Sequence, residues 1–445
     1  MAVRRIPNNR LRGLLTEAGW TGEQLARAVN QIAAESGQSL SYQRASVHQW
    51  LTGTVPRPPA AQLVCAALGR RLRRRITLTE AGFGAPRPEP AVPPDTGALL
   101  ARLAAAALTP DRRGDFLVYQ PLCADQLTDP PDPPGPPDQF EATAAPGGRP
   151  PTDPDTLALL LPAFSAVDRI QGGGQARTAL AAFLATTVAP MLAAPAPPVR
   201  RAGILSGAAR LSYLCAFMQL DDELNGLANQ YYRLSLTLAR EAGDTAGQAM
   251  ALRAMAALAY ELGLRAQGLR LAQAAADCHL APSSVRLRAA VLGQLALSEA
   301  AVGDRTAAHR HLGEARDRLA GATGPPPAVG DYHRASWDHQ RALVHVELGD
   351  RAGAIKFLEA STAHRPRTES RSRAVVLSRL AEAQLAAGHL AAACTTWHEF
   401  LDLYPLLDSR RARSAAERLR RLLLPHRRAP GADHLLQRAA SLHPH

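Results

Sequence analysis

"ELGDRAGAIKFLEASTAHRP", residues 347–366, contains the pattern that decides the fold. Gly349 lies between two stretches of helical apolar spacing, with Ala354 five residues later and Leu358 nine residues later. Pro366 follows and closes the second stretch. A glycine turn, a small residue where two helices can cross and a closing proline predict an antiparallel helical hairpin.

The same pattern recurs elsewhere in the chain. The turns "ELGLRAQG", "AVGDRTAA" and "AAGHLAAA" centre on Gly263, Gly303 and Gly388. The matching positions are Ala256, Ala296, Ala342 and Ala381 before the turns, Ala308, Ala354 and Ala393 after them, Leu312, Leu358 and Trp397 on the second helices, and the closing Pro366 and Pro405. An earlier unit carries Ala216, Glu223, Ala228 and Tyr232 at the corresponding places.

This spacing resembles the tetratricopeptide repeat. The glycines are 40, 46 and 39 residues apart, which exceeds the roughly 34 residues of that repeat and predicts longer helices or loops. Stacked hairpins bury one another and leave a concave groove. Chance recurrence in alanine-rich helices is the alternative, and five units in phase argue against it. We therefore predict an all-α chain in which residues 156–425 form a tetratricopeptide-like repeat domain.

The N-terminal region is the basic part of the chain. Residues 1–85 contain 12 arginines and 4 glutamates, a net charge of +8 out of +12 for the 445 residues. A basic surface releases counterions from a polyanion, so this imbalance favours a nucleic-acid partner. The apolar spacing predicts several short helices here, and Thr21 with Gln24 forms a capping-box signature at the start of the second. We predict a helix-turn-helix domain over residues 1–84.

The third predicted helix, within "YQRASVHQWLTG" (residues 42–53), has two distinct sides. Its apolar side carries Val47, Trp50 and Leu51, and its other side carries Arg44, Ala45, His48 and Gln49. The apolar side can anchor the helix, while the polar side can read a partner.

This helix resembles the recognition helix of the Xre, or lambda-repressor-like, family, whose pattern is Q-x-x-V-S-x-W/I-E-x-G. Arg44 takes the glutamine place, His48 the serine place and Gly53 the final glycine, with Val47 and Trp50 at the apolar places. Leu51 departs from the usual glutamate, and the loop before the helix is longer than usual. The resemblance implies that the helix enters the major groove of duplex DNA.

Base and phosphate contacts follow from side-chain chemistry. Arginine can hold guanine and glutamine can hold adenine through two hydrogen bonds, and alanine can meet the thymine methyl group. The predicted base contacts are Gln43, Arg44, Ala45, His48 and Gln49. The predicted phosphate contacts are Thr21, Arg57, Arg70, Arg71, Arg73 and Arg74. A solvated surface helix with no partner is the alternative.

Two proline-rich stretches separate the predicted domains. Residues 85–95 and 129–155 are too rich in proline and polar residues to bury a core. We predict a linker region over residues 85–155, with a short ordered island between residues 97 and 128 whose role the sequence does not indicate. At the other end we predict a tail over residues 426–445.

The whole arrangement is similar to that of the NsdA-like regulators of development and secondary metabolism in actinobacteria. "GWTGEQLARAVNQIAAESG" (19–37), "RASVHQWLTGTVPRPP" (44–59), "ITLTEAGF" (76–83) and "GGGQARTALAAFLATTVAPML" (172–192) carry this resemblance. It is also similar to peptide-sensing regulators that join a helix-turn-helix to tetratricopeptide repeats. These resemblances imply a homodimer and a peptide or protein partner in the repeat groove.

The sequence gives little support for a membrane protein, a disulfide-bonded protein or an enzyme. We find no apolar run near the roughly 18 residues of a membrane span and no signal-peptide pattern, so we expect a cytoplasmic protein without a membrane partner. The five cysteines show no CxxC spacing, which favours reduced thiols. Nucleotide-binding, metallopeptidase and hydrolase motifs are missing. "GGGQAR" (172–177) is interpreted as a flexible helix start, and we expect no enzyme, cofactor or metal site.

The basic stretch at residues 410–428 is amphipathic. Ala415, Leu419, Leu422 and Leu423 share one face, which predicts a helix that caps the repeats. A second surface for an anion or a partner is the alternative interpretation. His434, His443 and His445 fall in a tail that we expect to be frayed and solvated.

These observations predict a sequence-specific transcriptional regulator that binds double-stranded DNA as a dimer. The main rival is an adaptor, in which the repeats bind a protein or peptide and the N-terminal domain does not touch DNA.

Overall fold

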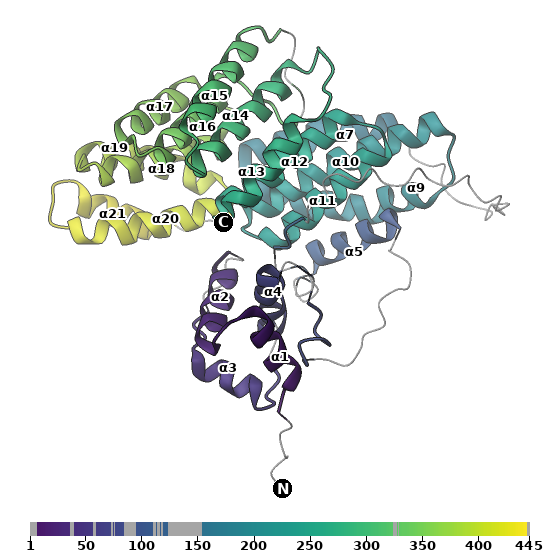
Figure 1. Ribbon diagram of the computed structural model, residues 1–445. Helices are drawn as coiled ribbons and strands as arrows, with labels where there is room; N and C mark the ends of the chain where they lie inside the picture. Colours follow the sequence, from purple (N-terminus) through teal and green to yellow (C-terminus); the bar gives the residue numbers. More distant parts are fainter. Residues whose placement is uncertain are drawn as a thin grey trace.

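The computed structural model describes residues 7–35, 40–56, 59–72, 74, 76–83, 95–109, 113, 116, 119–122, 154–323, 327 and 329–442. Within these residues every regular element is a helix, as the sequence predicts (Figure 1). A small N-terminal head lies below a larger curved body of helical hairpins (Figure 1).

The described residues of the head, which spans residues 7–83, form four helices. They are α1 (Asn9–Ala18), α2 (Gly22–Glu35), α3 (Arg44–Leu51) and α4 (Ala60–Leu72). Their apolar faces share one core, in which Leu11, Leu25 and Val47 are fully buried. Ile76 and Phe83 join the same core from the segment after α4. The buried core of the head therefore extends to Phe83.

Two sequence signals set the ends of the first helices. The backbone N–H of Thr21 donates to Gln24 Oε1 (2.8 Å), and the backbone N–H of Gln24 donates to Thr21 Oγ1 (3.3 Å). This is the capping box predicted at the start of α2. Gly19 ends α1 in the left-handed conformation, with φ 63°, which costs glycine little because it has no Cβ.

Five antiparallel hairpins form the repeat body. They are α10 (Pro198–Asp221) with α11 (Asn225–Glu241), α12 (Thr245–Glu261) with α13 (Arg265–Ala276), α14 (Val285–Ala301) with α15 (Arg305–Ala320), α16 (Arg334–Glu347) with α17 (Arg351–His364), and α18 (Ser370–Ala386) with α19 (Leu390–Leu403). Each hairpin stacks on the next to form a curved α-solenoid (Figure 1). The five predicted units are these five hairpins.

The predicted crossing positions are buried in every hairpin. Their exposure is at most 1% at Ala216, Ala228, Ala256, Ala296, Ala308, Ala342, Ala354, Ala381 and Ala393. The four turn glycines all have positive φ, at Gly263, Gly303, Gly349 and Gly388. Glu223 takes the same conformation in the first turn, with φ 57°, and no other non-glycine residue that the structure describes does so.

The short ordered island predicted within the linker region is present and packs on the body, whereas residues 85–94 and 129–153 of the predicted linker lie outside the described residues. The island's helix α5 (Thr96–Leu108) packs against α8 (Gly173–Phe183), a π-helical turn η2 (Leu184–Val188) and α9 (Ala189–Ala193). Farther along, the side chain of Asn229 on α11 donates to the backbone oxygen of Gln120 (2.8 Å). The side chain of Gln267 on α13 donates to the backbone oxygen of Leu122 (3.2 Å). Leu100 and Tyr119 are buried in the body's core.

One described stretch is long and apolar enough to cross a membrane, which the sequence-based expectation missed. It runs from Ala176 to Ala193 with a mean hydropathy of 1.4, and 44% of it is buried. Its helices pack against α5 and α10. An apolar helix in a protein core meets the same criteria of length and composition.

The two ends of the solenoid meet. Helix α7 (Pro154–Gln171), which precedes the hairpins, contacts both α10 and α18. At this contact Arg371 reaches Asp168 (3.2 Å) and Asp221 (3.7 Å), and all three side chains are nearly inaccessible to solvent. Burial raises the pKa of Asp168 to about 6, against the attraction of Arg371.

The glycines at residues 172–174 start a helix as predicted, because α8 begins at Gly173, but this helix start is fixed by the closure rather than flexible. The backbone N–H of Gly173 donates to Asp221 Oδ2 (3.1 Å), and that of Gly174 donates to the oxygen of Asp408 (3.0 Å). A Cβ atom at Gly173 would lie 2.8 Å from the backbone oxygen of Met218, and one at Gly172, whose φ is 96°, would lie 2.8 Å from the backbone oxygen of Asp408. Glycine is needed here because two chain segments approach closely.

The C-terminal region is more ordered than the sequence predicts. Helix α20 (Arg410–Leu423) buries Ala415, Leu419 and Leu423 as predicted, whereas Leu422 is 40% exposed. The tail forms a further helix, α21 (Ala432–Ser441), whose Leu435 is fully buried against α19 and α20. The expectation of a frayed tail was therefore wrong for residues 426–442, because α21 closes the core at the end of the solenoid, while His443 and His445 lie outside the described residues.

Ion pairs join helices across the concave side of the body. The sequence predicted a concave groove there but not these ion pairs. Glu261 on α12 pairs with Arg379 on α18 (3.7 Å) and with Arg411 on α20. Tyr260 on α12 donates to Glu347 Oε1 on α16 (2.9 Å). These helices belong to hairpins that are not neighbours in the stack, so the contacts span the inner side of its curve.

Candidate nucleic-acid interface

Helix α3 has one buried and one exposed side, as predicted. Val47 is fully buried and Trp50 is 4% exposed. The residues predicted to contact bases, Gln43, Arg44, Ala45, His48 and Gln49, are all classed as exposed. The helix lies at the end of the head that is remote from the repeats, while α4 lies next to them (Figure 1).

The exposed polar side chains of α3 have no partner within the described part of the chain. Arg44, His48 and Gln49 make neither a hydrogen bond nor an ion pair through their side chains there. A guanidinium, an imidazole and an amide can form several hydrogen bonds. Their donors and acceptors are therefore free to meet a ligand.

Contacts from α2 and the preceding loop hold α3 in place. The side chain of Asn30 donates to the oxygen of Tyr42 (2.8 Å) and accepts from its N–H (2.8 Å). The ring of Tyr42 meets Trp50 edge-on with 5.1 Å between ring centroids. Both contacts fix the start of α3, so its exposed side chains project from a rigid base.

The start of α2 lies beside the start of α3. A Cβ atom at Gly22 would lie 3.4 Å from Val47 Cγ1 and 3.9 Å from Arg44 Cγ. Thr21, the cap of α2, is exposed next to this crossing. The structure thus brings Thr21 and Arg44 to one region of the surface. The N-terminus of a helix also offers unpaired N–H groups and a positive dipole end to an anion.

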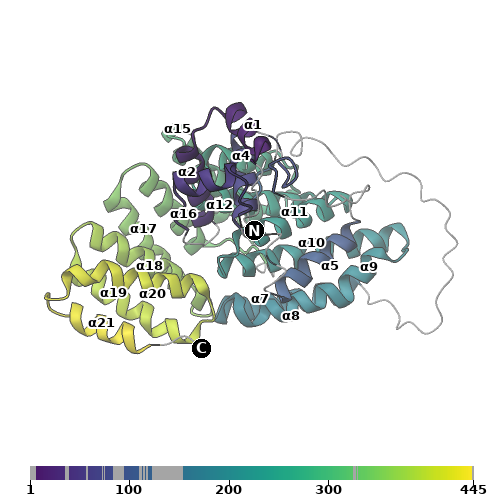
Figure 2. The same cartoon turned by 90° about the horizontal axis from the view of Figure 1, so that it is seen from below.

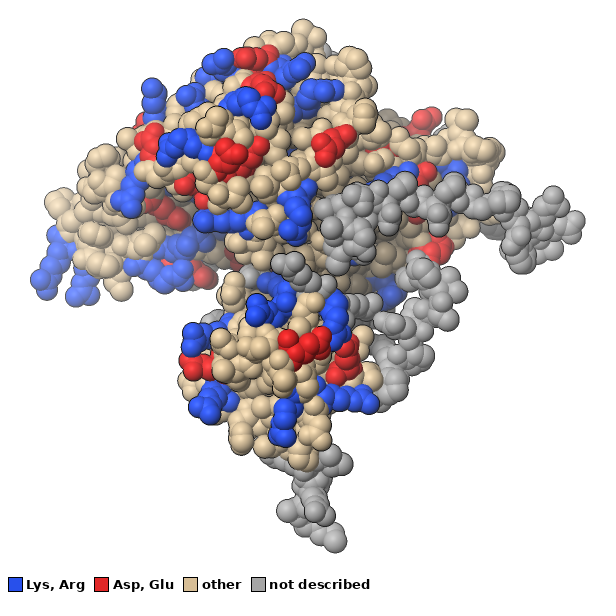
Figure 3. All heavy atoms as spheres, viewed as in Figure 1, with Lys and Arg blue, Asp and Glu red and all other residues tan. Residues whose placement is uncertain are grey.

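The described arginines that were predicted to contact phosphates have three different surroundings. Arg70 donates to the oxygen of Tyr119 in the body (3.4 Å), which draws it toward the repeats. Arg74 pairs with Glu17 (2.9 Å) and with Glu80, so two carboxylates neutralise it. Arg71 is exposed and uses only Nε, on the oxygen of Ala18 (2.9 Å). Arg57 and Arg73 lie outside the described residues. Basic side chains also lie on the end of the head remote from the repeats (Figure 3).

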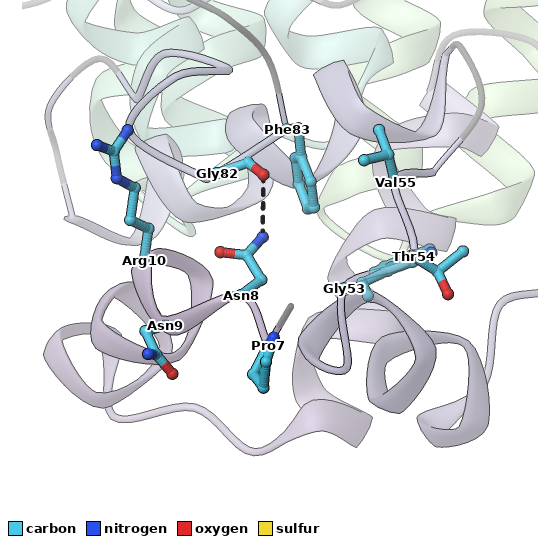
Figure 4. Close-up of a pocket in the computed structure, with 10 residues that line it drawn as sticks. Pro7, Asn8, Asn9, Arg10, Gly53, Thr54, Val55, Gly82 and Phe83 are labelled. Carbon is cyan, nitrogen blue, oxygen red and sulfur yellow. Dashed lines mark hydrogen bonds between the residues drawn. The ribbon is translucent and has the colours of Figure 1, made fainter. Parts of the chain in front are cut away.

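A shallow pocket beside the end of α3 was not predicted. It has a volume of about 390 Å³ and is lined by Pro7, Asn8, Asn9, Arg10, Trp50, Gly53, Thr54, Val55, Gly82 and Phe83 (Figure 4). Asn8 organises it: its N–H donates to the oxygen of Leu51 (2.9 Å) and its side chain to the oxygen of Ala81 (2.9 Å). Asn8 also caps α1. Asparagine is a preferred residue just before a helix, and this was the sequence signal that could have indicated the role of Asn8.

One cluster has the composition of a metal site. Asp331, His333 and Glu369 each offer a ligand atom within 4.8 Å of the others. However, Glu369 already binds His333 (2.9 Å) and Arg365 (2.7 Å), and Asp331 lies 3.8 Å from Arg286. These arginines supply the positive charge that a cation would bring, so the cluster is explained as an ion-pair network.

His309 and His311, two residues apart on α15, have separate surroundings. His311 Nδ1 lies 2.7 Å from Glu299 Oε2. His309 faces the ring of His345, with 6.4 Å between ring centroids. His434, expected in a frayed tail, belongs to α21 and faces His398 at 5.6 Å.

Comparison with known proteins gives one match for the N-terminal residues and one for a larger share of the chain. Residues 11–84 match a family described as the SP15 N-terminal domain. This match covers the head and its buried core. Curated proteins give no match. One solved structure, of a Rap protein complexed with competence and sporulation factor, is similar to 64% of this chain over 85% of its own length, with 14% identity and a TM-score of 0.42.

Proposed function

We propose that this protein is a sequence-specific transcriptional regulator that places α3 in the major groove of double-stranded DNA. The proposal includes a cytoplasmic location, no enzymatic activity and a place among the Xre-type regulators that the sequence resembles. The row of unpartnered side chains on the exposed side of α3 carries it.

The chemistry of that row suits base recognition. Arg44 can donate two parallel hydrogen bonds to guanine, and Gln43 and Gln49 can each pair with adenine. Each good bidentate pair contributes roughly 1–3 kcal/mol of discrimination between bases. Asn30, Tyr42 and Trp50 already fix the helix in the free protein. Binding therefore costs conformational entropy mainly in the side chains that contact the bases.

The start of α2 supports the proposal from the backbone side. Its N–H groups and Thr21 lie beside Arg44, so a phosphate gripped there would sit next to a base that Arg44 reads. Arg71 is the described arginine that remains free to add a second phosphate contact. Arg70 and Arg74 leave the predicted set, because the body and two carboxylates hold them.

A single head of this kind reads only a few base pairs. We therefore propose that two copies bind two half-sites together. The repeat body would hold the copies together and could take a protein or peptide partner. Any peptide on its inner side would have to accommodate the pairs from Glu261 to Arg379 and Arg411.

The adaptor function remains the second candidate, favoured by the extent of the helical-repeat body. Stacked helical hairpins form extended surfaces for protein partners. An adaptor would bind DNA weakly and without preference, through the charge of the head alone.

Selection from a pool of random duplexes distinguishes the two functions. The full chain is incubated with the pool at moderate salt, and the bound sequences are enriched over several rounds. We expect a short motif whose binding, measured by fluorescence anisotropy, exceeds that of a scrambled duplex at the same salt. Equal binding to the motif and the scrambled duplex would overturn the proposal and favour the adaptor.

A further inference from the structure

Helix α7 exposes an apolar side that nothing in the described structure covers. Between Asp155 and Gln171 every residue of α7 classed as exposed is apolar: Ala158, Leu159, Pro162, Ala163, Val167 and Ile170. Leu159 is 76% exposed, Ile170 47% and Val167 37%. We call these six residues the α7 face. The opposite side of α7 is already packed on α8, α10 and α18.

The α7 face is unusual for a helix surface. Single exposed apolar residues are common, but a helix side without a polar residue over four turns marks a contact surface. The neighbouring α8 adds to it, because Phe183 there meets Phe164 of α7 (6.3 Å between centroids) and both are only partly buried. The apolar surface therefore continues from one helix to the next.

We infer that the α7 face binds the same face of a second copy of this chain, with the two α7 helices antiparallel. In one respect this inference rests on the proposed function, since it locates the dimer contact that two half-sites require. The apolar face itself was found without reference to DNA.

The distribution of size and charge along α7 favours such a pair. A two-fold contact brings the same surface together twice, with the ends of the helices exchanged. Ala163 lies near the middle of the face, where a small side chain allows two helices to approach. Asp155 lies in the first turn of the helix and Arg169 in the last, so antiparallel packing brings the acidic end of each α7 to the basic end of the other.

A membrane surface is a poorer occupant. Helices that lie on membranes combine an apolar side with a basic polar side. The other side of α7 faces the protein core, and Arg169 is the basic residue near the face. The charge that would attract anionic lipid is therefore small.

The position of α7 is compatible with two heads acting together. Viewed from below, α7 and α8 lie along one edge of the body, and the head projects toward the viewer (Figure 1 and Figure 2). A two-fold axis along that direction, next to α7, leaves both heads on the same side of the dimer. One duplex could then run past both heads.

Light scattering after gel filtration tests the contact on the full chain. We expect twice the chain mass for the wild type and the single-chain mass for Leu159→Glu. Leu406→Glu is the matched control, because Leu406 is 65% exposed outside the α7 face; it should remain dimeric. A single-chain mass for the wild type, or a dimer that persists in Leu159→Glu, would overturn the inference.

Two further measurements keep the outcome clear if a variant misfolds or another surface is involved. Ala163→Cys should form a disulfide-linked dimer under mild oxidation, while the exposed Ala352→Cys on α17 should not. Equal cross-linking of both would count against the contact. Flotation with vesicles of anionic phospholipid should leave the protein unbound; binding that Leu159→Glu abolishes would assign the face to a membrane instead.

The proposed function and this contact fail in different ways. A dimeric wild type that binds no DNA motif refutes the regulator and leaves the contact intact. A monomeric wild type that enriches a motif refutes the contact alone.

Discussion

The core of the body and helix α3 of the head use polar side chains in opposite ways. In the body, buried and half-buried arginines are matched to carboxylates, as Arg371 is to Asp168 and Asp221, and Arg365 is to Glu369. On α3 of the head, Arg44, His48 and Gln49 have no partner within the described residues. The difference teaches that the role of an arginine here follows from its neighbours. Arginines paired with carboxylates stabilise the fold, and arginines without such a partner are available to bind a ligand.

The largest expected effect comes from breaking a matched arginine in the body. Arg371→Met would leave Asp168 and Asp221 buried without their common partner. Removing one member of a buried ion pair costs about 3–5 kcal/mol of unfolding free energy. Urea unfolding followed by circular dichroism measures the loss, with the exposed Arg421→Met as control, for which a change within about 0.5 kcal/mol is expected.

The pH dependence of Arg371→Met provides a second check. Burial raises the pKa of Asp168 from its ordinary 3.8 to about 6 in the folded protein. Between about pH 4 and 6 the folded state therefore keeps this proton while the unfolded state loses it. Asp168 lowers the free energy of unfolding by an amount that grows as the pH rises through this range. Without Arg371 the pKa rises further, because the attraction to the charged form is gone. The deficit of the variant should thus be larger at pH 8 than at pH 5, and an equal deficit would show that the loss is not electrostatic.

Breaking an unmatched arginine of the head should act on recognition alone. Arg44→Ala removes a side chain with no partner in the described protein, so the unfolding free energy should change little. If Arg44 reads guanine, preference at one base pair of the selected motif should fall by roughly 1–3 kcal/mol. Anisotropy titrations against duplexes with each base at that position measure the preference.

The control for Arg44→Ala is Arg421→Ala, an exposed arginine on α20 in the body. It should leave the base preference unchanged. Loss of preference in both variants, or a fall in affinity that is the same for every sequence with Arg44→Ala, would contradict a base-reading role.

The sequence predicted those features that depend on local pattern. The crossing alanines and turn glycines recur because each hairpin solves the same packing problem, so Ala256 and Gly263 repeat at Ala296 and Gly303. The capping box at Thr21 and the two sides of α3 also follow from spacing along one helix. All of these contacts form between residues close together in the chain.

Contacts between distant segments were not predictable from that pattern. Arg371 and Asp168 are separated by 203 residues along the chain, and nothing in either local sequence identifies the other as its partner. The same holds for Gly174 beside Asp408, and for Arg70 beside Tyr119. Arg74 had the composition of a phosphate contact, but Glu17 and Glu80 neutralise it through the folded structure of the head.

The smallest expected effect is that of Arg74→Ala. This variant tests whether pairing with carboxylates prevents an arginine from contacting DNA. A basic residue that contacts a phosphate releases a counterion, so its loss lowers the slope of affinity against salt by about 0.9 in logarithmic units. From sequence alone Arg74→Ala should do this. In the structure Arg74 donates to both oxygens of Glu17 and to Glu80, and these hydrogen bonds raise its pKa. We therefore expect Arg74→Ala to leave the salt slope unchanged.

Arg71, on the same stretch of chain, should behave differently. Its side chain is exposed and, among the described residues, faces no carboxylate, with Nε bound to the oxygen of Ala18. Arg71→Ala should lower affinity for all sequences alike and reduce the salt slope by about one unit. Both slopes come from anisotropy titrations of the selected duplex at several salt concentrations. A reduced slope for Arg74→Ala would mean that its carboxylate partners release it on binding, and matching within the free protein would then no longer separate structural arginines from functional ones.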